Sequence, residues 1–344
     1  MNFQFSEQED GFQAIRFDGQ RLRLLDQRRL PAEESWLEVG SADEAGRAIA
    51  DLVVRGAPAI GIAAAYAAVL AARQRGADQA GWQADMSRLE QARPTAVNLS
   101  WAVNRMRRQV AAAGCLDPEA LTELAVSIHR EDIAANRRMA ALGSEVIEPG
   151  SGVLTHCNTG SLATGGIGTA LGVIVAGARA GRIARVFADE TRPWLQGSRL
   201  TAWELARAGV DARILVEGAA GALMASGRVQ WVITGADRIT ARGDVANKIG
   251  TYNLAILARH HGLRFMVVAP ASTLDPDLES GQDIAIEQRD PAEIWRAAGL
   301  ESAPQGSGAW NPVFDITPSE LVDVIVTEHG VFRPPFRFDQ GPAA

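Results

Sequence analysis

The sequence contains little cysteine and no excess of basic charge. Its 344 residues include only Cys115 and Cys157, too few sulfurs for a disulfide framework or a cysteine-rich zinc site. We therefore expect no bound metal, and we expect Cys115 to be a buried free thiol. The formal net charge of −7 argues against broad binding to nucleic acid or to an anionic membrane. Any phosphate site must therefore be local.

Long apolar runs and a basic leader are also missing. No apolar run approaches the roughly 20 residues needed to cross a bilayer, and the first residues lack the basic start of a signal peptide. We therefore expect a cytoplasmic protein with no membrane partner. An apolar content of 47% with 22% charged residues is typical of a globular protein, and the length allows two domains.

The first half of the chain favours a mostly helical domain with a small antiparallel sheet. Asp18-Gly19 predicts a hairpin turn between Phe12–Phe17 and Gln20–Leu25. After Pro31 the pattern becomes helical, and the segment Glu148-Pro-Gly-Ser-Gly152 is typical of a domain boundary. We predict that residues 1–148 form this domain, with helices over 45–54, 60–73, 81–91, 99–113 and 118–142.

The second half alternates short apolar runs with segments of helical length. Strands that are apolar throughout are typical of a parallel sheet covered on both faces. We therefore predict a Rossmann-like, doubly wound α/β domain over residues 149–344. Its expected strands are 153–155, 185–188, 212–216, 231–234 and 265–269, with 313–316 and 324–326 as two further candidates.

The most informative segment is a polar, glycine-rich turn that follows the apolar run Gly152–Thr155. It begins at His156-Cys157-Asn158 and ends at Gly168, before an alanine-rich helix expected from about Thr169. The carboxyl edge of a parallel sheet is open, and the next helix presents unpaired N–H groups to an anion. This arrangement predicts a small phosphorylated substrate held near the Cys157 sulfur, with a buried free thiol as the alternative.

Three other polar clusters lie at expected element ends. Arg55-Gly56-Ala57 precedes a helix and suits a phosphate, although it could be a plain glycine turn. In Ala188-Asp-Glu-Thr-Arg-Pro-Trp-Leu-Gln196, the amide could donate to a sugar hydroxyl, and the acids could be solvated turn residues. Asp237 ends a strand and Lys248 is expected to open a helix; they could serve as general acid and phosphate ligand, or form a surface ion pair.

A dinucleotide-binding fingerprint is a competing interpretation of the glycine-rich turn. Gly166 and Gly168 supply two of its three glycines, and Asp189 lies about twenty residues further on. Leu171 occupies the place of the third glycine, and the polar residues from Cys157 crowd the turn. A hydride-transferring dehydrogenase therefore remains an alternative to a cofactor-free enzyme.

Taken in order, eight segments resemble the signature segments of methylthioribose-1-phosphate isomerase. This is the catalytic branch of a family that also includes the α, β and δ regulatory subunits of the translation initiation factor 2B exchange factor. The similarity is collinear from about residue 20 to 333, but the segment from Glu293 to Asn311 departs from the usual pattern. The matching segments are Asp26-Gln-Arg, Val54-Arg-Gly-Ala-Pro-Ala-Ile-Gly61, Ala92-Arg-Pro-Thr-Ala-Val-Asn98-Leu, His156-Cys-Asn-Thr-Gly160, Ala188-Asp-Glu-Thr-Arg-Pro193, Gly235-Ala-Asp-Arg238, Gly243-Asp-Val-Ala-Asn-Lys-Ile-Gly-Thr251 and Val313-Phe-Asp-Ile-Thr-Pro318.

The resemblance implies an aldose-ketose isomerase of methionine salvage that acts as a homodimer without a cofactor. Cys157 and Asp237 match the two catalytic positions of the family. The regulatory branch generally lacks the combined catalytic set, so the resemblance favours an enzyme. The substrate-binding positions are matched by Arg55, Gly56, Ala57, Arg93, Gln196, Asn247 and Lys248.

The implied reaction converts 5-methylthioribose 1-phosphate into 5-methylthioribulose 1-phosphate. Asp237 would protonate the ring oxygen, and hydrogen would move from C2 to C1, either as a proton through Cys157 or as a hydride. The sequence does not choose between these routes. Nor does it fix the C5 substituent, so 5-deoxyribose 1-phosphate and ribose 1,5-bisphosphate remain alternative substrates.

Overall fold

The chain groups into two compact units in the computed structural model, which describes residues 5–7, 11–93, 97–297, 299, 301, 303 and 306–340. Unit 1 comprises Met1–Arg137 and Gly160–Gly168, and unit 2 comprises Arg138–Thr159 and Thr169–Ala344. The glycine-rich segment therefore belongs by its contacts to unit 1, although it lies between two stretches of unit 2 in the chain. The division after residue 148 stays a prediction.

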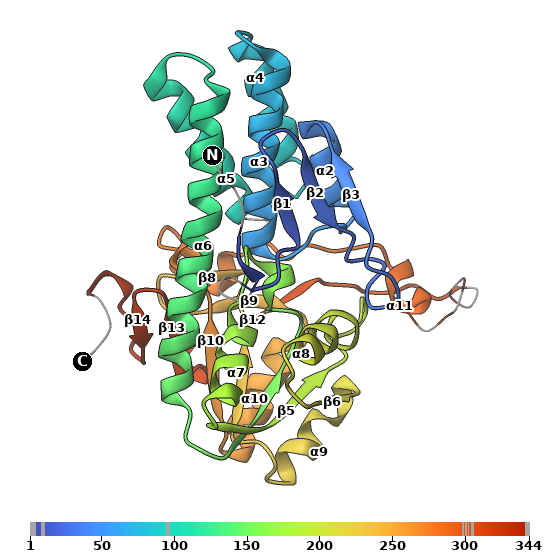
Figure 1. The fold of residues 1–344 in the computed structure, drawn as a ribbon. Helices are drawn as coiled ribbons and strands as arrows, with labels where there is room; N and C mark the ends of the chain where they lie inside the picture. Colours follow the sequence, from blue (N-terminus) through green and yellow to red (C-terminus); the bar gives the residue numbers. More distant parts are fainter. Residues whose placement is uncertain are drawn as a thin grey trace. The chain divides into compact units, whose positions relative to one another are not determined.

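Unit 1 combines a three-stranded antiparallel sheet with helices, as expected (Figure 1). The hairpin is confirmed, because Phe17 pairs with Leu22 across the turn. A third strand, Trp36–Val39, pairs with the second, so the helical expectation after Pro31 was wrong there; only Val39 of this strand is buried, which weakens its apolar signal. The elements are β1 (Ile15–Phe17), β2 (Leu22–Leu25), β3 (Trp36–Val39), α2 (Ala42–Ala50), α3 (Ala57–Arg75), α4 (Gln79–Glu90), α5 (Val97–Ala113) and α6 (Pro118–Val146), whose end enters unit 2.

Helix α3 is the core of unit 1. Its alanine-rich sequence is buried on almost every side, because small side chains let neighbouring elements approach it closely. The expectation about apolar runs was wrong here, since α3 has the length and composition to cross a membrane. However, 78% of its most apolar window is buried inside the structure, as in the core helix of a globular domain. Cys115 was also wrongly expected to be buried; it is exposed in the turn after α5.

Unit 2 contains the predicted parallel sheet, and its strand order is that of a Rossmann fold. From one edge the order is β6-β5-β4-β7-β10-β13-β14, and all neighbours are parallel except β13 and β14. The strands are β4 (Ser151–Thr155), β5 (Ile183–Asp189), β6 (Ala212–Leu215), β7 (Trp231–Thr234), β10 (Arg264–Val268), β13 (Val324–Thr327) and β14 (Gly330–Phe332). When the six parallel strands are numbered 1 to 6 along the chain from β4, their order in the sheet is 3-2-1-4-5-6, with a switch point between β4 and β7.

The two faces of this sheet are covered by different helices. Leu154 of β4 joins an apolar cluster with Leu254 and Ala255 of α10, whereas Gly177 of α7 lies against Ile183 of β5. Burial on both faces explains why these strands are apolar throughout. The helices of unit 2 are α7 (Ala170–Arg179), α8 (Ala202–Arg207), α9 (Ala220–Ala225), α10 (Thr251–His261) and α11 (Ala292–Arg296).

A second sheet of unit 2 was not predicted from the sequence. Its order is β11-β8-β9-β12, with β8 (Arg238–Thr240), β9 (Val245–Lys248), β11 (Leu274–Asp275) and β12 (Phe314–Thr317). The run 313–316 was expected in the parallel sheet, but β12 pairs antiparallel with β9 instead. Lys248 was expected to open a helix, whereas it ends strand β9, and α10 begins three residues later at Thr251.

Candidate functional site

The polar clusters of unit 2 lie at the topological switch point of the parallel sheet. Strands β4 and β7 are parallel neighbours, with Thr155 opposite Ile233. The segment from His156 therefore leaves the sheet beside the segment from Gly235, and Gly235 lies against the side chain of Thr159. Ligands of such sheets bind outside the carboxyl ends of the strands at the switch point. The fold thus places Cys157 and Asp237 on two loops where a ligand is expected.

Cys157 is held in an uncommon backbone conformation. Its φ is +64°, which a residue with a Cβ rarely adopts. Its N–H donates to Thr191 Oγ1 at 2.8 Å, and its carbonyl accepts from Thr201 Oγ1 at 2.6 Å. Strain of this kind persists only where neighbours enforce it, and it is common at active sites. The two threonine hydroxyls thus define the position of a buried thiol.

The structure brings Gln196 to the Cys157 sulfur, a contact that the sequence did not predict. Its side chain is 3% exposed, and Nε2 donates to Cys157 Sγ at 3.4 Å. Gln196 Oε1 is buried and has no hydrogen-bond partner among the described residues. Because an unsatisfied buried amide oxygen is costly, this atom is suited to accept a hydrogen bond from a bound hydroxyl. The residue stands just before the π-helical turn η2 (Gly197–Thr201) that leads into α8.

His156 is part of a buried charged network that the sequence did not predict. Its Nδ1 lies 2.8 Å from Asp189 Oδ2, and its Nε2 lies 2.9 Å from the carbonyl oxygen of Ile249. Asp189 also accepts a hydrogen bond of 2.6 Å from Thr191 Oγ1. The alternative that the acids of this loop are solvated is therefore wrong for Asp189, which is fully buried.

The remaining predicted residues of unit 2 lie on the second sheet and beside it. Asp237 is half-buried in the link between β7 and β8, with its N–H bonded to Ala246 O at 2.9 Å. Asn247 is buried and donates to Thr251 Oγ1 at 2.9 Å. Lys248 Nζ donates to Val313 O at 3.0 Å and lies over the Phe314 ring. His156 connects this segment to the Cys157 loop, because Ile249 follows Lys248 directly.

The predicted residues of unit 1 stand at the start of α3 and before α5. Gly56 is the N-cap of α3 with φ +95°, and a Cβ there would come within 2.5 Å of Ala163. Glycine is therefore required by both the backbone conformation and the close approach. Arg55 and Ala57 flank it, and both are half-buried. Arg93 is half-buried in a bend; the matched segment continues through residues 94–96, outside the described part of the chain.

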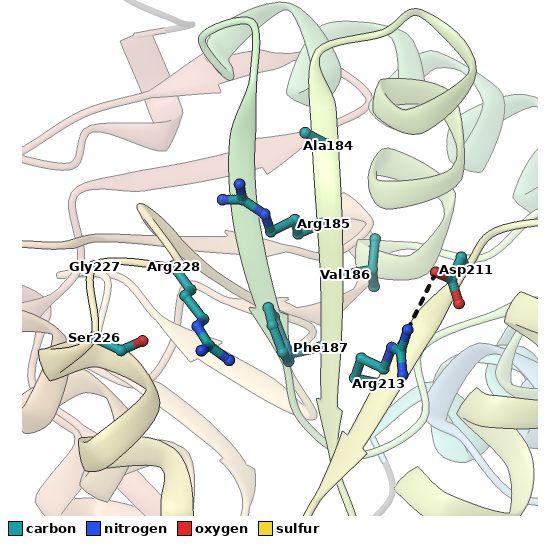
Figure 2. Close-up of a pocket in the computed structure, with 9 residues that line it drawn as sticks. All are labelled: Ala184, Arg185, Val186, Phe187, Asp211, Arg213, Ser226, Gly227 and Arg228. Atoms are coloured by element: carbon teal, nitrogen blue, oxygen red, sulfur yellow. Dashed lines mark ion pairs between the residues drawn. The ribbon is translucent and has the colours of Figure 1, made fainter.

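A pocket of about 650 Å³ in unit 2 contains none of the predicted site residues. Figure 2 shows the arginines that line it and the ion pair of Arg213 with Asp211. The lining residues come from the first part of β5, the start of β6 and the approach to β7, which are the amino ends of the parallel strands. Because ligands of this fold bind at the opposite, carboxyl ends, the pocket is not the candidate catalytic site. Within the described residues, no group of three or more His, Cys, Asp or Glu side chains is arranged to hold a metal.

Comparison with known proteins identifies the family. The model of the initiation factor 2 subunit family matches residues 53–334. The chain belongs to the initiation factor 2 subunit family. A methylthioribose-1-phosphate isomerase of Thioalkalivibrio sulfidiphilus is 56% identical over 332 residues, 95% of each chain.

Solved structures agree with this membership. The crystal structure of 5-methylthioribose 1-phosphate isomerase from Pyrococcus horikoshii is 39% identical, with a TM-score of 0.88 over 99% of this chain and 98% of that one. A structure of translation initiation factor eIF-2B, subunit delta, from A. fulgidus is 40% identical, with a TM-score of 0.82 over 94% and 96%. The resemblance seen in the sequence and the predicted fold class are both confirmed.

For this member of the family, sequence reasoning assigned no role to His156 or Thr191, and it considered Asp189 only as the acidic residue of a dinucleotide-binding fingerprint. One signal could have indicated the pair of His156 and Asp189: the histidine directly follows one predicted strand and the aspartate ends the next. Carboxyl ends of neighbouring parallel strands meet at one sheet edge. Because β4 and β5 are parallel neighbours, the histidine and the aspartate were candidates for contact.

Proposed function

We propose that this chain converts 5-methylthioribose 1-phosphate into 5-methylthioribulose 1-phosphate, a step of methionine salvage. The observation that carries the proposal is the 56% identity, over 95% of each chain, to a protein named methylthioribose-1-phosphate isomerase. The geometry supports it, because the matched residues Cys157 and Gln196 meet at the switch point of the sheet. Asp237 stands on the neighbouring loop, after β7.

In this proposal Asp237 acts first, as the general acid. The anomeric oxygen carries the phosphate, so the sugar ring cannot open as it does in a free sugar. Asp237 donates its proton to the ring oxygen as the bond from C1 to that oxygen breaks. After ring opening, the Asp237 carboxylate takes the proton of the C2 hydroxyl as the ketone forms. The acid is thereby restored for the next turnover.

Cys157 carries the hydrogen transfer between carbons. Its thiolate removes the proton from C2, which leaves an enol phosphate, and the thiol then returns that proton to C1. A direct hydride shift from C2 to C1 is the competing route, in which Cys157 would act only through its charge. Gln196 supports either route, because its amide can bind both the sulfur and a sugar hydroxyl.

We also propose the substrate-binding residues. Arg55 and Arg93 would bind the phosphate, Arg55 by a bidentate contact beside the N–H groups of Gly56 and Ala57 at the start of α3. Lys248 and Asn247 would bind the phosphate or the sugar from the end of β9. Lys248 already has a half-buried, oriented ammonium group, which reduces the entropy lost on binding.

The test is turnover followed by proton and phosphorus NMR. Protein treated with a chelator, without added nicotinamide cofactor, should convert 5-methylthioribose 1-phosphate to the ketose. Parallel reactions with 5-deoxyribose 1-phosphate and ribose 1,5-bisphosphate would define the C5 group that the enzyme accepts. Strict dependence on NAD would overturn the proposal and favour the dehydrogenase.

A regulatory role is the second candidate. The 40% identity to the A. fulgidus protein named as an eIF-2B subunit is the observation that favours it. A regulatory subunit would show no turnover of any of the three sugar phosphates and would associate stably with guanine nucleotide exchange subunits. Turnover abolished by Cys157→Ser would exclude a purely regulatory role.

We propose further that the protein is a cytoplasmic homodimer with a small sugar phosphate as its partner. The resemblance supports the homodimer, and the negative net charge supports the absence of nucleic-acid and membrane partners. Light scattering after size exclusion should give twice the 36.6 kDa chain mass. A monomeric mass at micromolar concentration would contradict the homodimer without affecting the proposed reaction.

A further inference from the structure

The pocket at the amino ends of the parallel strands is lined by three arginines (Figure 2). Arg185 lies on β5, Arg213 lies on β6, and Arg228 lies in the link between α9 and β7. The pocket volume of about 650 Å³ falls within the range of small-molecule sites, roughly 300–1,000 Å³. The pocket is therefore large enough for a ligand of its own, apart from the candidate catalytic site.

Two of these arginines lie beside an aromatic ring on one face of the sheet. Side chains alternate between the faces along a strand, so Arg185 and Phe187 of β5 share a face. Phe187 pairs with Arg213 of β6, which places the Arg213 side chain on that face as well. Phe187 is half-buried and packs against the apolar cluster that includes residues of α9 and α10. The pocket thus combines cationic side chains with an apolar wall.

Arg228 is brought to the same place by a glycine of β4. Gly152 pairs with Arg185, and a Cβ on Gly152 would clash with the carbonyl oxygen of Arg228. Gln230 holds the loop in position, because its Nε2 donates to Gly227 O at 3.0 Å and its Oε1 accepts from Gly152 N–H at 2.8 Å. The backbone that carries Arg228 is therefore ordered before any ligand binds, which lowers the entropy lost on binding.

The pocket has an excess of positive charge. Among its described lining residues Asp211 is the single acid, and it lies 3.9 Å from Arg213, with the two side chains 89% and 76% exposed. In the part of the chain that the structure describes, neither Arg185 nor Arg228 forms an ion pair. Three arginines against one aspartate leave an excess of two positive charges. In a chain with 41 acidic and 34 basic residues, this concentration of positive charge suits an anionic ligand.

We propose that this pocket is a second binding site and that its ligand is a nucleoside phosphate. Guanidinium groups bind phosphate oxygens in a bidentate manner, so the phosphates contact Arg185 and Arg228. The flat apolar base contacts Phe187. Inorganic phosphate would leave most of the pocket volume and the apolar wall unused, whereas a nucleotide matches the volume, the charge and the ring together.

The first test is calorimetric titration with ADP at about 50 mM salt, where charges are only partly screened. Arg185→Ala and Arg228→Ala should each lower the affinity about tenfold, through loss of a charge-assisted contact. Arg179→Ala is the matched control, because Arg179 is exposed at the end of α7 and its replacement removes the same charge outside the pocket. Absence of ADP binding, or an equal loss of affinity in all three variants, would overturn the proposal.

The second test divides the ligand into its two parts. ADP should bind more tightly than adenosine or pyrophosphate alone, since each of these uses only one part of the pocket. Phe187→Leu should weaken binding of ADP and leave binding of pyrophosphate unchanged, with thermal unfolding as the check that the variant is folded. Pyrophosphate that binds as tightly as ADP would show that the apolar wall is not used, and a nucleoside phosphate would then be the wrong class of ligand.

Asp211→Asn reverses the sign of the effect. It removes the negative charge from the pocket, so the affinity for ADP should rise about twofold to fivefold, as expected for one exposed charge. An unchanged or lower affinity would contradict the proposal, because the charge of the pocket would not govern binding.

The inference goes beyond the proposed isomerase activity, and its tests do not depend on that activity. Arg55→Ala alters the proposed substrate site and should leave the affinity for ADP unchanged; loss of ADP binding in this variant would place the nucleotide there and overturn the inference. If the parent turns over no sugar phosphate but Arg185→Ala still weakens ADP binding, the proposed function fails and the inference holds. If the parent turns over substrate and does not bind ADP, the proposed function holds and the inference fails.

Discussion

Arg55 could bind the substrate phosphate or merely precede the helix, and these two interpretations predict different effects of its replacement. It precedes the N-cap of α3, where a guanidinium and free helix N–H groups can bind one phosphate. Arg55→Ala should weaken substrate binding by roughly 1.5–3 kcal/mol through loss of a charge-assisted hydrogen bond. Calorimetric titration measures the change, with exposed Arg47 replaced by alanine as the control. Binding of substrate and inorganic phosphate equal to that of the parent would reduce Arg55 to a helix-start residue.

Asp237 and Cys157 are distinguished by what their variants do to chemistry and to binding. Asp237→Asn keeps the shape and removes the acidic proton, so kcat should fall by about two to four orders of magnitude with little change in substrate binding. The exposed Asp211, replaced by asparagine, is the matched control. Parent-like kcat in Asp237→Asn would show that the general acid lies elsewhere.

Cys157→Ser tests the route of the hydrogen. A hydroxyl is a far weaker base than a thiolate, so proton transfer predicts near-complete loss of turnover and, in the parent enzyme, solvent deuterium at C1. A hydride shift predicts no deuterium and partial activity in the variant. Because a shielded proton transfer can also lack exchange, both results are read together by NMR of the product.

Residue types and spacing were sufficient to place the clusters of Cys157 and Gln196 at strand ends, but they predicted neither the contact between these two side chains nor the network behind them. The sulfur and the amide follow neighbouring strands of one sheet, and that relation is visible in the sequence pattern. The contacts of His156 with Ile249, and of Asp315 with Gly250, join segments 93 and 65 residues apart. Such contacts depend on the second sheet, which the sequence did not reveal.

At the scale of elements, the two glycines that cap α10 are required for different reasons. Gly250 and Gly262 cap its two ends, both with positive φ. A Cβ at Gly262 meets nothing within 4 Å, whereas one at Gly250 would meet Glu217 and His156. Gly262→Ala should therefore cost about 1 kcal/mol of stability from its backbone alone. Gly250→Ala should cost about 1–3 kcal/mol and also lower turnover, because it displaces the histidine.

Urea unfolding and kcat of these two variants provide the measurement. Equal loss of stability with normal turnover in both would mean that Gly250 is only a helix cap.

The sequence predicted some helices and strands better than others. The buried parallel strands and long helices matched their apolar patterns, whereas β8, β9, β11 and β12 are two to four residues long. Pairing between such short, partly exposed strands is decided by the tertiary fold rather than by local propensity.

At the scale of the whole molecule, the division into two units by contacts does not follow the order of the residues in the chain. Residues Gly160–Gly168 follow Cys157 closely in the chain but belong by contacts to unit 1. Gln27 donates to Leu162 O, and Asp132 accepts from Gly165 N, both at 2.7 Å. A sequence pattern read along the chain could not reveal such a grouping, because it depends on side chains 33 and 135 residues away.

The stability of the whole molecule should depend on pH through His156. Burial lowers the pKa of His156, but the charge and hydrogen bond of Asp189 outweigh burial and raise the pKa from the ordinary 6.5 to about 10 in the folded chain. The folded state therefore keeps a proton that the unfolded state releases. The resulting stabilisation is fully present below pH 6.5 and is lost as pH rises toward 10, at up to about 1.4 kcal/mol per pH unit. Asp315 affects the stability at lower pH than His156 does. Burial raises its pKa to about 6, so its effect is to lower stability as pH rises from about 4 to 6, and it adds no slope above pH 7.

The change of the urea midpoint between pH 7 and 9 therefore reports the contribution of His156 to stability. In the parent protein the midpoint should fall steadily across this range. In H156Q/D189N the fall should be much smaller, because the variant has no imidazolium to deprotonate. Cys157→Ser in both backgrounds removes the neighbouring thiol, so that the comparison concerns His156 alone. Equal slopes in the two backgrounds would mean that His156 folds as a neutral imidazole, and that the carboxylate of Asp189 orients the ring without charging it.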